Sequence, residues 1–180
     1  MEQEKQKAAL NLSLVMGDNA LILGHRLSEW CGHGPILEQD IALSNIALDL
    51  IGQARLWLSH AGKLQGGKSE DDLAYHRDVF DFHNFQMVET PNGHWGTTLF
   101  RQFVYDAWHH AMLQKLVHAQ DEDIAGIARK SLKEVNYHLR WSSEWVIRLG
   151  DGTEESGAKM QEAYADVWPY VGELLQKDTW

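Results

Sequence analysis

Four acidic residues and one histidine lie where helices would turn them towards a common interior. Asp18, Asp49, Asp106 and Glu134 fall in four apolar-patterned segments, and His138 follows Glu134 by four residues. Helical bundles hold pairs of iron or manganese ions with a carboxylate from each of two helices and a Glu-x-x-His pair from each of the other two. These five residues could therefore serve a stand-alone di-metal carboxylate oxidase.

The set departs from the cage that two metal ions require. Gly52 stands three residues after Asp49, where an imidazole is needed, and Val135 stands three residues before His138, where a carboxylate is needed. Glu134 is thus rotated away from the chelating arrangement. Three of the acids are Asp, which retracts each oxygen by roughly 1.5 Å, whereas metal–ligand distances tolerate about 0.2 Å. We expect no tight metal binding and assign no catalytic, cofactor-binding or metal-binding residue.

A neutralised polar core is the simpler interpretation of the same acids. An unpaired buried charge costs several kcal/mol, so each acid should have an internal partner. The partners available on the same segments are His25, Arg55, Lys130 and His138. We therefore predict a salt-bridged or proton-sharing interior.

Further histidines give weaker signals. Asp106 and His109 have the spacing of a metal-binding pair, but adjacent residues of a helix point about 100° apart. At most one of His109 and His110 can therefore face the core, and the other is expected at the surface or at a helix cap. The histidines in the connections have no recognisable partner: His33, His76, His83 and His94.

Other catalytic motifs are missing from the sequence. Gly66-Gly67-Lys68-Ser69 lacks the upstream glycine and the preceding strand of a phosphate-binding loop, so we expect a turn and a helix cap there. There is no nucleophile elbow and no Cys-His pair of nucleophilic spacing. Cys31 is the sole cysteine, which excludes an internal disulfide and fits a reducing compartment. We expect its side chain to be buried.

The segments that carry these residues have helical patterns. The sequence has three prolines, and apolar residues recur every three or four positions. The predicted helices cover about 8–31, 35–63, with Pro35 in the first turn, then 97–120 and 122–149, and a further one that begins at Thr153. The second of them is apolar on nearly every side, so we expect it to be largely buried.

About thirty residues separate the second and third of these helices. They include a short helix begun by Ser69 and a turn at Pro91-Asn92-Gly93. An up-down bundle needs only short loops, whereas a ferritin-like bundle needs a long crossover at this point. We predict an all-α fold, a single ferritin-like four-helix domain over residues 1–180 with an additional C-terminal helix.

Composition excludes several classes of partner. The 16 Lys and Arg against 26 Asp and Glu give a net charge of −10, and the cations are scattered, so we expect no nucleic-acid partner. No apolar run approaches the ~20 residues that span a bilayer, and the start lacks a signal-peptide core. We expect a cytoplasmic protein with no membrane partner.

Several segments, in order along essentially the whole chain, resemble one known family. They are residues 27–35, 49–55, 88–93, 106–109, 137–140 and 149–153. They resemble the non-catalytic structural subunits of the bacterial ring-1,2-phenylacetyl-CoA epoxidase, a multicomponent oxygenase of phenylacetate catabolism. Such subunits usually continue well past the residue that matches Trp180, so this chain is either a short member or a truncated one.

This resemblance implies a ferritin-like subunit in a heteromeric complex with a homologous catalytic subunit. The partner's di-iron centre would activate O2 and insert one oxygen atom into the aromatic ring of phenylacetyl-CoA, with electrons supplied from NADPH by a reductase. Members of the family are described as having lost the metal ligands, so the resemblance implies no cofactor in this chain. We also expect a homodimer when the partner is absent, and a homo-oligomeric helical protein without any catalytic partner is a further hypothesis.

Overall fold

The computed structural model describes residues 2–176. Residue 1 and residues 177–180, the ends of the predicted domain, lie outside the described residues. Over the described part the chain is helical and has no β-strand, as the sequence predicts. The four long helices are α1 (Glu2–Ser28), α2 (Leu37–Leu64), α5 (Trp95–Leu116) and α6 (Glu122–Gly150).

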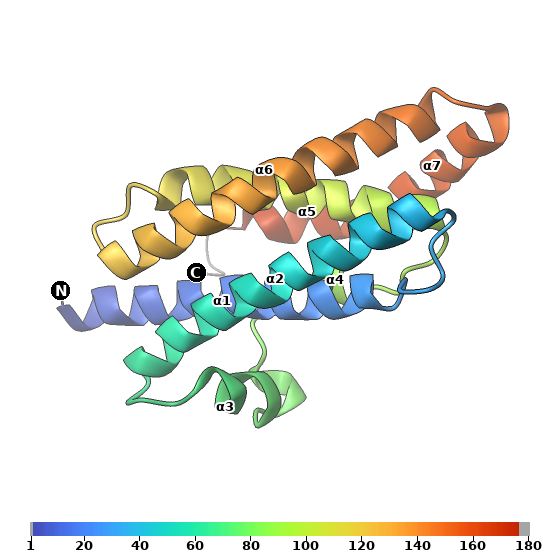
Figure 1. The fold of residues 1–180 in the computed structure, drawn as a ribbon. Coiled ribbons are helices and arrows are strands. Elements are labelled where there is room, and N and C mark those ends of the chain that lie inside the picture. Colours follow the sequence, from blue (N-terminus) through green and yellow to red (C-terminus); the bar gives the residue numbers. More distant parts are fainter. Residues whose placement is uncertain (1, 177–180) are drawn as a thin grey trace.

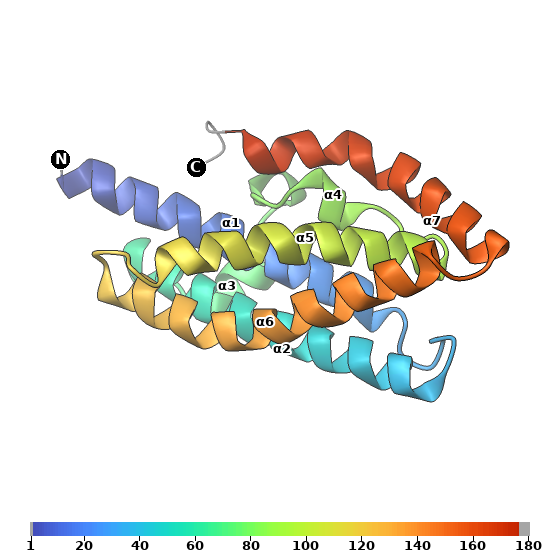
Figure 2. The same ribbon diagram turned by 90° about the horizontal axis from the view of Figure 1, so that it is seen from above.

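The order of the helices in space follows from the long connection between α2 and α5. Helices α1 and α2 run antiparallel to each other, and so do α5 and α6, but α5 runs in the same direction as α2 (Figures 1 and 2). The connection must therefore carry the chain back along the bundle. It does so through α3 (Glu70–Tyr75), the 3-10 helix η1 (Val79–Asp81) and α4 (Gln86–Glu89).

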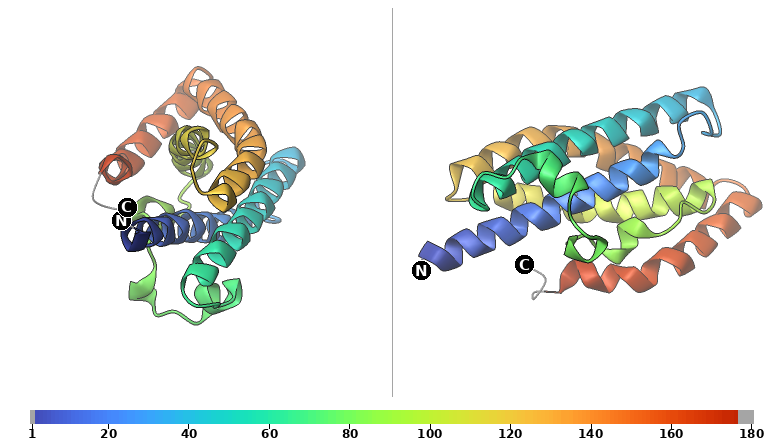
Figure 3. Two further views of the ribbon diagram at one scale, coloured as in Figure 1. Left: turned by 90° about the vertical axis from the view of Figure 1, so that its left-hand side faces the viewer. Right: turned by 90° about the horizontal axis from the view of Figure 1, so that it is seen from below.

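The C-terminal elements cover one side of α5. Helix α7 (Glu154–Val167) and the 3-10 helix η2 (Trp168–Leu175) follow α6 and return along the bundle. Seen down the bundle, α5 lies centrally, between α6, α7 and α1 (Figure 3). The face of α5 that carries Asp106 is therefore enclosed by neighbouring helices.

Local side-chain caps determine where several helices begin. Ser69 and Asp72 form a capping box at the start of α3, Asp121 accepts two backbone N–H bonds at the start of α6, and Thr153 caps α7. These caps confirm the predicted starts at Ser69, Glu122 and Thr153. Pro35 lies outside α2, contrary to prediction, because Ile36 is the N-cap.

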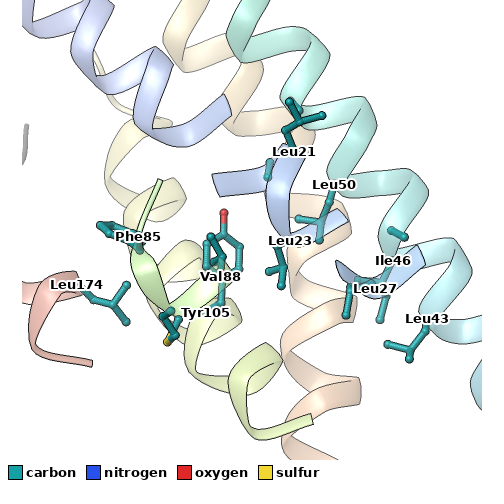
Figure 4. Packing of buried hydrophobic residues seen from close by; sticks show 14 of the residues in the cluster. Leu21, Leu23, Leu27, Leu43, Ile46, Leu50, Phe85, Val88, Tyr105 and Leu174 are labelled. Atoms are coloured by element: carbon teal, nitrogen blue, oxygen red, sulfur yellow. The ribbon is translucent and has the colours of Figure 1, made fainter. Parts of the chain in front are cut away.

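The apolar core joins the helices around α1. Leu23 and Leu27 of α1 pack with Ile46 and Leu50 of α2, and Val88 of the crossover reaches the same cluster (Figure 4). All five side chains are buried. Close packing of this kind contributes about 1.5–3 kcal/mol for each such residue, so the bundle holds the polar residues between its helices in defined positions.

Two burial predictions are wrong. Cys31 is exposed because α1 ends at Ser28, so the cysteine lies in the following turn rather than on a helix face. Helix α2 is not largely buried: it contacts α1, α3 and α6, and its opposite side is open. None of the helices within residues 2–176 is both long and apolar enough to cross a bilayer.

Candidate functional site

Asp18 is buried, as predicted, but its partners come from the crossover. Arg77 donates hydrogen bonds to both carboxylate oxygens through Nη1, at 3.0 Å, and Nη2. The backbone N–H of His83 donates another at 2.9 Å, and the His83 ring lies 3.7 Å from the same carboxylate. Asp18 therefore secures the crossover to α1. Arg77 lies 59 residues further along the chain, and no local pattern in the sequence connects it to Asp18.

A hydrogen bond between Asp49 and His138 is one of the contacts that join α2 to α6. His138 Nε2 lies 3.0 Å from Asp49 Oδ2. The imidazole is fully buried, whereas the carboxylate is half-buried at the edge of the helix pair. Since an ionised carboxylate only accepts hydrogen bonds, Nε2 carries the proton in this contact. His138 is thus one of the predicted neutralising partners.

Glu134 turns away from His138 and bonds to the amide of Gln53. Gln53 Nε2 donates a 2.8 Å hydrogen bond to Glu134 Oε2 across the same two helices. The glutamine is buried, and its Oε1 has no hydrogen-bonding partner within residues 2–176. Glu134 and His138 lie four positions apart on α6, but they contact different residues of α2, Gln53 and Asp49.

Asp106, like Asp18, is fully buried. Gln102 Nε2 donates a 2.7 Å hydrogen bond to Oδ1, and Ser142 Oγ of α6 donates a 2.7 Å bond to Oδ2. Burial raises the pKa of this carboxyl to about 7, against the opposing effects of His138 and of the two hydrogen bonds. The carboxyl therefore exchanges its proton near neutral pH. Gln102 was not singled out from the sequence, although its i,i+4 spacing from Asp106 is a usable signal.

His109 faces the core and His110 does not, so the prediction that at most one of them faces inward is confirmed. His109 is fully buried, and neither ring nitrogen has a hydrogen-bonding partner in the described part of the chain. Burial, with repulsion from His138 and His110, lowers the pKa of His109 to about 3, so its ring is neutral. His110 is half-buried and lies 2.9 Å from Asn136 Oδ1.

The acids do not converge on one point. Over residues 2–176, no group of three or more His, Cys, Asp or Glu side chains is placed to hold a metal ion. Arg77 binds Asp18 on the crossover side, and amide and hydroxyl groups occupy both oxygens of Asp106. Each carboxylate oxygen of Asp18 and Asp106 thus already accepts a hydrogen bond from this chain. The residues present therefore do not fit a di-metal cage.

Gly52 gives a further reason for the poor fit. The residue is exposed on the open side of α2, and no atom of residues 2–176 lies within 4 Å of the place that a Cβ would occupy. A histidine at this position would point away from the core. Even with a histidine at residue 52, α2 would not present an imidazole to the internal acids.

The remaining candidate residues have local structural contacts. Gly66 and Gly67 have positive φ angles in the turn before the Ser69 cap, as expected for a turn. His94 accepts the N–H of Thr97 at the start of α5, and His76 lies 3.2 Å from Asp72.

Three of the predicted neutralising partners do not reach the acids. Within the described residues, His25, Arg55 and Lys130 form no hydrogen bond or ion pair with Asp18, Asp49, Asp106 or Glu134. Arg55 binds Glu70 instead. Each of the four acids has a hydrogen-bonding partner within the chain, but His138 is the one partner among them that the sequence indicated.

Comparison with known proteins agrees with the resemblance found in the sequence. Residues 1–179 match the model of the family described as phenylacetic acid catabolic protein. The chain is 49% identical over 166 residues to one of the subunits of the 1,2-phenylacetyl-CoA epoxidase of Escherichia coli (strain K12). This alignment covers 92% of the chain and 67% of the relative. The chain therefore belongs to the phenylacetic acid catabolic protein family.

Proposed function

We propose that this chain is the non-catalytic structural subunit of a phenylacetyl-CoA epoxidase that acts in phenylacetate catabolism. The main observation behind the proposal is that the internal acids are bound by other side chains of the chain. Side chains of this same chain donate hydrogen bonds to all four acids: Asp18, Asp49, Asp106 and Glu134. The similarity to a subunit of 1,2-phenylacetyl-CoA epoxidase supplies the reaction to which such a chain would contribute.

The architecture of the chain supports the same role. The parallel direction of α2 and α5, with a long crossover between them, is the arrangement expected of a ferritin-like bundle in a single domain over residues 1–180. In this proposal a homologous ferritin-like subunit in the same cytoplasmic complex holds the di-iron centre. The present chain binds no cofactor and contributes a rigid helical surface to the complex.

The polar interior would then have a structural role. Polar contacts between α2 and α6 and between α5 and α6 restrict how these helices slide or rotate, because every displaced donor or acceptor would be left unsatisfied in a buried place. Asp106 with Ser142 restricts one pair of helices, and Asp49 with His138 restricts the other. A subunit that orders its partner needs a surface that does not rearrange.

Elemental analysis tests the proposal directly. The chain is purified alone after iron supplementation, alongside the catalytic subunit treated in the same way. We expect far less than one iron per chain here and near-stoichiometric iron in the catalytic subunit. Ordered iron bound to Asp49, Asp106, Glu134 or His138 at near-stoichiometric amounts would instead support a stand-alone di-metal oxidase.

Co-expression provides the second arm of the test. We expect the chain to co-purify with the catalytic subunit and to give no oxygenase turnover by itself. Phenylacetyl-CoA oxygenation should appear only with the catalytic subunit and the reductase, and should fall when this chain is omitted. Full turnover of the catalytic subunit without this chain would overturn the structural role.

A further inference from the structure

Helix α2 carries exposed apolar side chains, and the proposed function does not specify what covers them. Four large aliphatic side chains are exposed in its first half and just before it: Ile36 by 51%, Leu37 by 71%, Ile41 by 52% and Leu48 by 67%. Single exposed aliphatics are ordinary, but a contiguous group on one helix is typical of an interface. Figure 3 (left) shows α2 at the edge of the bundle, with its outer side away from the other helices.

Two of these side chains, Ile41 and Leu48, belong to a regularly spaced face of the helix. We define the outer face of α2 as Glu38, Ile41, Asn45, Leu48, Gly52 and Arg55, all of which are exposed. Their separations alternate three, four, three, four, three, which is the pattern of a helix that packs lengthwise against another helix. The face therefore suits a long helical partner better than a compact ligand.

A hollow lies beside the C-terminal half of this face. It has a volume of about 430 Å³ and lies between α2 and α6, with Leu48, Gly52 and Leu56 on one side and Lys130 and Glu134 on the other. Gly52 opens the hollow because it has no side chain and nothing occupies the space next to its Cα. An aliphatic side chain from a neighbouring helix could enter at this point.

We propose that the outer face of α2 packs against the same face of a second copy of this chain, antiparallel, about a two-fold axis near residues 46 and 47. In this register Ile41 lies against Gly52 of the second copy, where the hollow accepts it. Asn45 lies beside Leu48 of the second copy. The two-fold axis repeats each contact, as in an isologous dimer.

Charge along the helix selects this partner and orientation. The antiparallel register brings Glu38 of one copy to Arg55 of the other, and it does so twice. A parallel pairing would place Glu38 against Glu38 and Arg55 against Arg55, which is unfavourable. Arg55 is 75% exposed on its side chain even though it binds Glu70 at 3.1 Å, so its guanidinium remains accessible. The face is thus complementary to itself in one direction only.

The first test measures the mass of the chain in solution by light scattering from low to about 100 µM concentration. We expect a dimer whose dissociation constant increases by at least about thirtyfold in Leu48→Glu, which places a charge in the centre of the contact. Ile147→Glu is the matched control, since Ile147 is a 66% exposed aliphatic residue that belongs to α6 and not to the outer face of α2. Because Leu48 is exposed, circular dichroism should show that both variants fold normally.

The second test determines how the two copies of α2 are aligned with each other. In a Cys31→Ser background, Asn45→Cys and Leu48→Cys variants are oxidised separately and as a mixture. Disulfides need Cα atoms within about 7 Å, so the antiparallel register predicts that the mixture cross-links faster than either variant alone. A parallel pairing would give the opposite order.

Three outcomes would overturn the proposal. One is a monomer throughout the concentration range, and another is equal weakening by Leu48→Glu and Ile147→Glu. The third is a chain that is monomeric by itself and uses the outer face of α2 solely for the catalytic subunit. Iron content and reconstituted turnover are measured separately, so the dimer and the proposed function can fail independently.

Discussion

The hydroxyl of Ser142 donates a 2.7 Å hydrogen bond to Asp106 Oδ2, and both residues are fully buried between α5 and α6. This contact connects two helices through a group whose charge changes near neutral pH, because burial raises the pKa of Asp106 to about 7. The stability of the bundle should therefore respond to pH through this one carboxyl.

Replacing Asp106 by Asn should remove a pH dependence of stability. The folded chain holds the Asp106 proton up to about pH 7, whereas the unfolded chain releases it near the ordinary pKa of 3.8. The stabilisation is complete below about pH 4 and is lost as the pH rises through 7. Asn cannot ionise, so the unfolding free energy of Asp106→Asn relative to the parent should rise by a few kcal/mol between pH 4 and pH 8.

Urea unfolding at intervals across this pH range makes that measurement. Asp166→Asn serves as a control, because Asp166 is exposed on α7 and should leave the pH profile unchanged. Parallel profiles for the parent chain and Asp106→Asn would show that this carboxyl does not titrate with a raised pKa.

Ser142→Ala should destabilise the chain more at pH 8 than at pH 5. It deprives the ionised Asp106 carboxylate of a donor in a buried place, which costs about 1–3 kcal/mol. A protonated carboxyl needs the donor less, so the loss should shrink at acid pH. Ser143→Ala is the matched control, since the Ser143 hydroxyl only bonds to the carbonyl of Arg140 on its own helix. Equal losses in the two variants would contradict the role of the Asp106 contact.

Arg77→Ala should loosen the crossover. It leaves Asp18 buried without its cationic partner, and breaking a buried ion pair in this way costs about 3–5 kcal/mol. Limited proteolysis should then cut within residues 76–84 well before the four long helices are attacked. Arg129→Ala, which removes an exposed ion pair with Glu122, should cost less than about 1 kcal/mol and leave the cleavage pattern unaltered.

Gly62→Ala should be destabilising although Ala is the better helix former. A Cβ at this position would lie 2.1 Å from the carbonyl oxygen of Lys68, so the turn that begins the crossover would have to move. We expect a loss of about 2 kcal/mol or more. In Gly126→Ala on α6 the new Cβ meets no atom of the described residues within 4 Å, so the unfolding free energy should rise by up to about 1 kcal/mol. Thermal unfolding of both variants makes the comparison, and a stabilised Gly62→Ala would refute the close approach.

Local patterns were sufficient to predict that the long helices exist, although α1 covers Glu2–Ser28 and not 8–31, and α5 ends at Leu116 and not near 120. The apolar spacing predicted the four long helices and the fifth near Thr153, and capping residues placed the starts of α3, α6 and α7. These features involve residues within one or two helical turns of each other, so the sequence contains the interacting pair directly. The length of the connection between α2 and α5 likewise required the chain to cross the bundle.

The family was also accessible from the sequence, because its residues recur in order along most of the chain. The identity of 49% to a subunit of the Escherichia coli epoxidase agrees with the segments that suggested it. Inferring that Asp18 and Asp106 point inward required only the neighbouring apolar positions, and both are fully buried.

The partners of the acids depended on the tertiary structure. Asp18 binds Arg77 and not His25, because the crossover folds back across α1. Asp49 contacts His138 and Glu134 contacts Gln53, because α2 and α6 pack in one rotation relative to each other. The open side of α2, with Ile41 and Leu48 exposed, follows from the same placement. Periodicity along one helix determines which residues share a face, but only packing between helices determines what that face contacts.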